Sequence, residues 1–244
     1  MKKRISALDL LRGTAMIYVM FYHLMFDLKY IYGSDTPDVL TPNNEIFEVS
    51  HVFFLWILFS VSGVCVGFSR DPLKRGVLLY LAGFGITLAT QIFMPSELIV
   101  FGVLSCFGAC MTITALCRPL LDKLPPVTAL IWFGLWVLSM HFPQSINLIF
   151  TQIPLNIPSY APLYPIGITG NGFYSADYFP LIPYIFMYLT GYALYPLVKE
   201  KMPKWFCNVP EIKPVNFIGR HSLIFYIVHQ PVLLAICELL FMIG

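Results

Sequence analysis

Apolar residues occur along this chain in long runs separated by short polar segments. A run of roughly 17 to 25 apolar residues can cross the hydrocarbon core of a membrane, which is about 30 Å thick. Seven runs approach this length, the fifth being short, at residues 7–28, 50–69, 76–95, 98–117, 127–142, 178–198 and 215–242. The pattern predicts an all-α fold, a polytopic membrane helical bundle of about seven transmembrane helices.

The composition agrees with this prediction. Of the 244 residues, 58% are hydrophobic and 11% charged, which leaves too little polar surface to cover a soluble globule. The net charge of +2 gives no indication of nucleic-acid binding. No repeat, low-complexity tract or linker divides the sequence, so we expect residues 1–244 to form a single membrane domain.

The distribution of basic residues predicts the orientation in the membrane. Twelve of the fifteen Lys and Arg residues lie in the first four residues and in three alternate loops, 69–75, 117–126 and 199–213. Because Lys and Arg near helix ends favour the cytoplasmic side, these segments are expected inside. An odd number of spans then places the N-terminus inside and the C-terminus outside. Residues 143–177 are expected to cap the outer mouth of the bundle or to lie passively at the interface.

Four ionisable residues fall in or against the first apolar run: Asp9, Arg12, His23 and Asp27. On a helix they lie within about 80° of one another and therefore share one face. Such residues cost about 2.5–3.5 kcal/mol each at the centre of a membrane helix, so they face protein or water and usually mark function. Asp27 follows His23 by one turn and can orient its imidazole as in a general-base dyad. Asp9 and Arg12 could instead form a structural ion pair.

The last apolar run carries a second set of ionisable residues. Arg220 and His221 stand at its start, and His229 lies about 12–14 Å further along a helix. Pro231 frees a backbone carbonyl in the same region, a local break that membrane helices often use near functional sites. Packing of His229 against this break is the structural alternative.

Several segments resemble one known family. Residues 4–27 and the following "FFLWILFSVSG" resemble the start of the heparan-alpha-glucosaminide N-acetyltransferase-like family of bacterial membrane proteins. The spacing of Arg12 and His23 also resembles that of the acyltransferase-three family of sugar O-acetyltransferases. Further similar segments are "LIVFGVLSCFG" (98–108), "DYFPLIPYIFMYLTGYAL" (177–194) and "GRHSLIFYIVHQP" (219–231).

The resemblance implies an inner-membrane acyltransferase that moves an acetyl group from acetyl-CoA to an amine or hydroxyl of a sugar-like small molecule or glycan at the extracytoplasmic side. Such chemistry needs a base and oxyanion stabilisation. The candidate catalytic residues are His23, Asp27 and His229. Charged residues expected at the cytoplasmic face are the candidates for binding the donor's phosphates: Arg12, Asp9, Arg220, His221, Lys74 and Arg75. The candidate acceptor-binding residues are His51, Asp177 and Gln230.

Two other functions are open at this point. In a proton-coupled small-molecule transporter, the His, Asp and Arg stripe would serve as a proton relay, although paired half-repeats are not visible. A non-catalytic membrane partner protein is the third reading. Whether histidine acts as a base or carries the acyl group is also open. We expect contact with membrane lipid, no nucleic acid and no metal, and leave open whether the chain forms a homo-oligomer.

The predicted topology can be tested with single cysteines introduced into residues 143–177. A membrane-impermeant thiol reagent should label them from outside intact cells, because seven spans with an internal N-terminus place this segment there. Labelling only after the membrane is permeabilised would contradict the topology.

Overall fold

The computed structural model describes residues 5–148, 151–158, 160–202, 206 and 209–243. Residues 1–4 and part of the 199–213 loop, which entered the prediction of orientation, lie outside the described residues. The chain divides into two compact units. The first contains residues 1–61 and 202–244, and the second contains residues 62–201.

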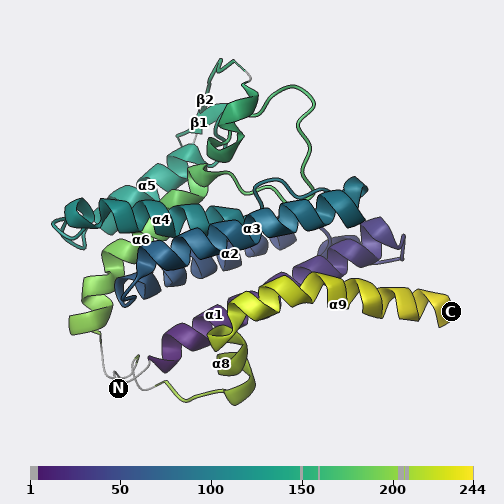
Figure 1. Ribbon diagram of the computed structural model, residues 1–244, viewed down its shortest axis with the longest axis horizontal. Helices are drawn as coiled ribbons and strands as arrows, with labels where there is room; N and C mark the ends of the chain where they lie inside the picture. The colour runs from purple at the N-terminus through teal and green to yellow at the C-terminus, as the bar shows by residue number, and fades with distance from the viewer. Residues whose placement is uncertain (1–4, 149–150, 159, 203–205, 207–208, 244) are drawn as a thin grey trace. The chain divides into compact units, whose positions relative to one another are not determined.

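Helices make up nearly all of the regular structure (Figure 1). They are α1 (Ser6–Phe26), α2 (Glu45–Gly67), α3 (Pro72–Phe93), α4 (Val103–Leu121), α5 (Thr128–Ser139), α6 (Leu181–Glu200), α8 (Lys213–Arg220) and α9 (Ser222–Ile243). Shorter helical turns are Asp27–Ile31, Asp38–Leu40, Pro95–Glu97 and Ala161–Ile166, and the strands are β1 (Ser145–Asn147) and β2 (Gln152–Pro154). Each predicted apolar run therefore contains a helix.

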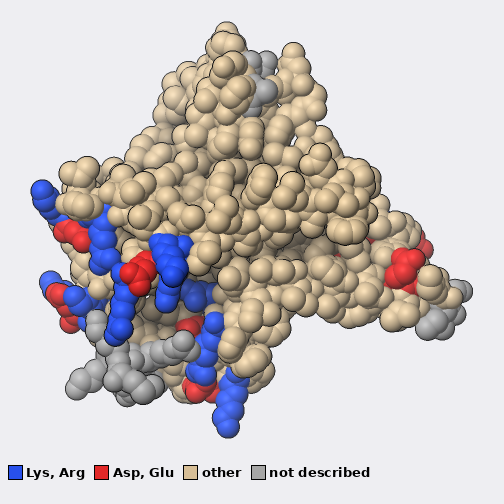
Figure 2. Space-filling model, in the orientation of Figure 1, with Lys and Arg blue, Asp and Glu red and all other residues tan. Residues whose placement is uncertain are grey.

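Among the described residues, five helical segments are long and apolar enough to cross a membrane: Asp38–Gly67, Pro72–Phe93, Val103–Leu121, Leu181–Glu200 and Ser222–Met242. Helix α1 has 21 residues but carries the polar stripe and is not among them, and α5 has only 12 residues. Most of the face seen in Figure 2 is free of charged side chains. The chain is therefore an α-helical membrane protein, and the number of seven spans stays a prediction.

In the first unit, α1 and α9 run side by side in the same direction (Figure 1). The ring of His23 faces that of His229, and nine residues further along the hydroxyl of Tyr32 donates to Glu238. Contacts that advance together along both helices define a parallel pair. If both helices cross a membrane, their far ends emerge on the same side, as the predicted topology requires. That orientation stays a prediction.

The last apolar run forms two helices where the sequence predicted one span. Helix α8 ends at Arg220 and α9 begins at Ser222, because His221 between them leaves helical geometry with φ −112° and ψ 23°. The hydrophobic pattern continues across this break and does not reveal it. Arg220 therefore belongs to a separate short helix.

Glycines allow α8 to pack closely against α1. A Cβ atom added to Gly219 would lie 1.9 Å from the carbonyl oxygen of Asp9, and one added to Gly13 would lie 2.0 Å from that of Val215. No other side chain fits at either position without moving the backbone. The close contact holds the first turns of α1 against the helix that precedes α9.

In the second unit, α3 and α4 are antiparallel neighbours. Gly76 packs against Thr112, and Gly83 packs against Ser105. Residue numbers therefore increase along α3 in the direction in which they decrease along α4. Helices α5 and α6 also pack together, with Trp132 stacked on Phe186.

The segment predicted as a cap has folded structure of its own. Strands β1 and β2 form an antiparallel hairpin in which Ile146 pairs with Ile153. Further along, the hydroxyl of Ser175 accepts a hydrogen bond from the backbone N–H of Val100 at 2.8 Å. The segment is thus attached to the stretch before α4 within the second unit, and its position outside the membrane stays a prediction.

Candidate functional site on helices α1, α8 and α9

The polar stripe of α1 faces the C-terminal segment of the chain. Near the start of α1, Asp9 contacts α8, and one turn from its end the His23 ring contacts α9. Asp27, which follows the last residue of α1, also contacts α9. The shared face predicted from the sequence is therefore in contact with protein, as ionisable residues in an apolar helix require.

Two histidines meet between α1 and α9. The ring centroids of His23 and His229 are 5.0 Å apart, with 60° between the ring planes. His229 is 8% exposed, and His23 is half-buried. Two of the predicted catalytic residues, 206 positions apart in the sequence, are thus brought together by the parallel helix pair.

A backbone carbonyl fixes the tautomer of His229. Its Nδ1 lies 2.6 Å from the carbonyl oxygen of Tyr226. Because a carbonyl can only accept, Nδ1 must carry the proton of this hydrogen bond. In the neutral ring, Nε2 is then the unprotonated nitrogen. Sequence analysis did not single out Tyr226, since its contribution is a backbone atom.

Asp27 is fully buried and interacts with the residue next to His229. The Nε2 group of Gln230 donates to both carboxylate oxygens of Asp27, each at 3.0 Å. The backbone N–H of Asp27 also donates to the carbonyl of His23, so these two residues are one helical turn apart as predicted. The predicted orientation of His23 by the Asp27 carboxylate stays a prediction.

The third histidine of the candidate set lies on α2 in the same unit. The His51 ring stacks on Tyr22 with centroids 3.7 Å apart and 16° between the planes. Tyr22 in turn meets the neighbouring His23 edge to face, with centroids 6.1 Å apart. Tyr22 is a contact that sequence analysis missed, because one tyrosine among many in apolar helices carries no distinctive signal.

In the part of the chain that the structure describes, no three His, Cys, Asp or Glu side chains are placed to bind one metal ion.

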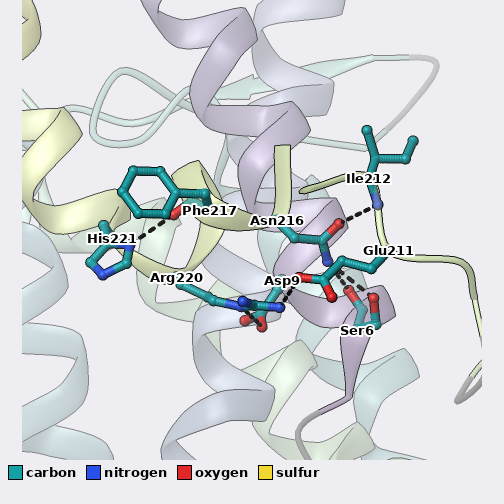
Figure 3. A network of polar contacts seen from close by, with 8 residues as sticks. All are labelled: Ser6, Asp9, Glu211, Ile212, Asn216, Phe217, Arg220 and His221. Carbon is teal, nitrogen blue, oxygen red and sulfur yellow. Dashed lines mark hydrogen bonds and ion pairs between the residues drawn. The ribbon is translucent and has the colours of Figure 1, made fainter. Parts of the chain in front are cut away.

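At the start of α1, Arg220 joins two carboxylates (Figure 3). Its Nε lies 3.2 Å from Asp9, and its terminal amino group forms an ion pair with Glu211. The hydrogen bond with Asp9 is the main reason why the pKa of Arg220 is raised above its ordinary value. Asp9 thus pairs with Arg220 and not with Arg12, the partner that the sequence suggested. Arg12 is half-buried and makes no ion pair with a described residue.

Asn216 fixes α8 on α1 beside this ion pair. The side chain is fully buried, and its Nδ2 donates to the backbone carbonyl and the hydroxyl of Ser6 at 2.9 and 3.1 Å (Figure 3). Its Oδ1 accepts from the backbone N–H of Ile212, the N-cap residue that precedes α8. One amide therefore satisfies groups on both helices, a role that the sequence pattern does not indicate.

His221 lies at the break between α8 and α9 and is exposed. Its Nδ1 donates to the carbonyl oxygen of Phe217 at 2.9 Å, and its ring tilts against that of Phe217 with centroids 4.5 Å apart. The other ring nitrogen of His221 is therefore directed away from α8.

The remaining candidates belong to the second unit. Lys74 and Arg75 are exposed near the start of α3. Asp177 is half-buried beside Gly102, and its backbone carbonyl accepts from the hydroxyl of Ser175 at 3.2 Å. Next to it, burial raises the pKa of Tyr178 to about 12, and the hydroxyl donates to the carbonyl of Tyr164 at 2.5 Å.

These observations define a helical membrane protein in which two histidines meet between the first and last helices. The chain belongs to the family described as "Heparan-alpha-glucosaminide N-acetyltransferase, catalytic", whose family model matches residues 4–231. No curated protein and no solved structure matches the chain. Family membership makes it an acetyltransferase-like, multi-pass membrane protein, which confirms the family inferred from sequence motifs.

Asn216→Ala should lower the free energy of unfolding by about 1–3 kcal/mol, because it removes the hydrogen bonds that this fully buried side chain makes with Ser6 and with the backbone N–H of Ile212. Denaturant unfolding of the purified protein in detergent measures the change. Lys213→Ala, on an exposed position of the same helix, is the control and should stay within about 0.5 kcal/mol of the wild type. Equal stability of the two variants would contradict the assigned role of Asn216.

Proposed function

We propose that this protein transfers an acetyl group from acetyl-CoA to an amine or hydroxyl of a sugar-like acceptor at the extracytoplasmic side of a bacterial inner membrane. Membership of an N-acetyltransferase family supports the reaction class. The observation that carries the proposal is the contact between the rings of the half-buried His23 and the buried His229, held between two parallel helices.

The histidine pair supplies the proton transfer that this reaction needs. The acceptor nitrogen or oxygen attacks the thioester carbonyl carbon, forming a bond to that carbon, and the carbon–sulfur bond breaks. The acceptor's proton moves to an imidazole, and the leaving thiolate is protonated to give coenzyme A. The Tyr226 carbonyl holds His229 in the tautomer whose Nε2 can accept this proton. The His23 ring, edge to face with that of His229, is the second candidate base.

The donor's phosphates are proposed to bind at the start of α1. A guanidinium is the side chain best suited to phosphate oxygens, because it presents several N–H donors in one plane. Arg220 already serves Asp9 and Glu211, whereas Arg12 makes no ion pair with a described residue. Arg12 is therefore the primary phosphate ligand in this proposal. Arg220 and Asp9 act by fixing the surrounding helix ends, and the exposed His221 is the further candidate in this unit for a phosphate contact.

Arg12→Ala should weaken the binding of coenzyme A about tenfold to a hundredfold, since it removes a charge-assisted hydrogen bond. Arg220→Ala is the matched variant and should lower thermal stability, because Asp9 and Glu211 lose their shared partner. Isothermal titration with coenzyme A and thermal unfolding separate the two effects. Unchanged affinity in Arg12→Ala would move the donor's phosphates away from this end of α1.

His229→Ala and His23→Ala should each reduce acetyl transfer, by about 100-fold to 10,000-fold for the residue that acts as the base. Affinity for coenzyme A should be retained in both, because the base acts when the acceptor loses its proton. Release of the coenzyme A thiol measures transfer. If only His229→Ala is inactive, α9 carries the base. Full activity in both variants would overturn the mechanism.

A further inference from the structure

Asp27 determines which end of the Gln230 amide is available to other groups. The Nε2 of Gln230 is 3.0 Å from each oxygen of the Asp27 carboxylate. A carboxylate accepts hydrogen bonds, so the amide must present its nitrogen to Asp27. Because the amide is planar, Oε1 on the same carbon is directed away from that carboxylate.

The Oε1 atom of Gln230 is buried and has no hydrogen-bond partner in the part of the chain that the structure describes. Buried polar atoms in proteins nearly always have partners, and exceptions occur at functional sites. An amide oxygen can only accept, so its missing partner is an N–H or O–H group. Those are the groups that an amine or hydroxyl acceptor brings to an acetyltransferase.

The position of Gln230 places this atom on the catalytic turn of α9. Gln230 directly follows His229, and the two residues contact Asp27 and His23, which are one turn apart at the end of the first helix. Both contacts join the same two helices. The amide is consequently held rigidly in the helix pair that carries the histidines.

We propose that Gln230 Oε1 accepts a hydrogen bond from an N–H or O–H of the acceptor and so positions it for the reaction, and that Asp27 is a positioning residue that holds Gln230 in this orientation. The inference rests on the proposed acetyl transfer. It gives the buried carboxylate of Asp27 a role through Gln230, separate from the predicted orientation of His23.

An exchange of the two side chains tests the proposal. In Asp27→Asn, one of the two oxygens that accept from Gln230 Nε2 is replaced by an NH₂ donor, so the Gln230 amide is no longer held with Oε1 directed at the acceptor. In Gln230→Glu, two carboxylates face each other and the donor to Asp27 is lost. In the double variant, the new asparagine donates to the new glutamate, whose second oxygen restores an acceptor at the original place. Each substitution preserves side-chain size.

Steady-state kinetics with acetyl-CoA and methyl α-glucosaminide, a sugar amine, provide the measurement. Each single variant should raise the KM for the sugar about tenfold or more, as expected for the loss of one hydrogen bond, while the KM for acetyl-CoA changes less than about twofold. The double variant should return the sugar KM to within about threefold of the wild type. A merely structural role would alter both KM values together.

Tyr32→Phe is the control. It removes another hydrogen bond between the end of the first helical segment and α9, the one from Tyr32 to Glu238, and should leave the sugar KM unchanged. Unchanged sugar KM in both single variants, or a double variant as impaired as the singles, would overturn the proposal. If the wild type transfers no acetyl group, the proposed function fails. Equilibrium binding of methyl α-glucosaminide to the wild type, the two single variants and the double variant then tests the Gln230 contact by itself.

Discussion

Polar groups in an apolar helix bundle must find their partners within the protein, and this constraint organises the first unit. The face of α1 that carries Asp9, His23 and Asp27 is covered by α8 and α9, which come from the other end of the chain. Water is unavailable in a hydrocarbon core, so each unsatisfied polar group there would cost several kcal/mol. The contact between α1 and the C-terminal helices follows from that cost.

The same constraint divides the length of α1 into two parts with different chemistry. At the start of α1, Arg220 pairs with Asp9 and Asn216 donates to Ser6 (Figure 3). Two glycines allow the backbones of α1 and α8 to approach closely there. These contacts hold α8 firmly against the start of α1. At the other end, the histidine pair and the Gln230 amide keep nitrogen and oxygen atoms able to accept a proton or a hydrogen bond. In the proposed mechanism, the close packing at one end of α1 supports the reacting groups at the other.

Fixed tautomers and fixed amides are a common feature of sites that transfer protons, because the reacting atom must already be in the right state when the substrate arrives. Here a backbone carbonyl sets the state of His229, and a carboxylate sets the orientation of Gln230. The proposed reaction uses Nε2 of His229 and Oε1 of Gln230, and neither of these contacts involves those atoms. The proposed acetyl transfer needs groups of this kind.

The sequence by itself determined the helical membrane architecture, the shared face of Asp9, His23 and Asp27, and the family, because hydrophobic run length, helical periodicity and local motifs are encoded by neighbouring residues. It identified His229 and Gln230 as candidates but not their partners. Only the tertiary structure decided that Asp9 pairs with Arg220, that Asp27 holds Gln230, and that the last apolar run breaks at His221. Those outcomes depend on contacts between residues about 200 positions apart, which a periodic pattern along one helix cannot specify.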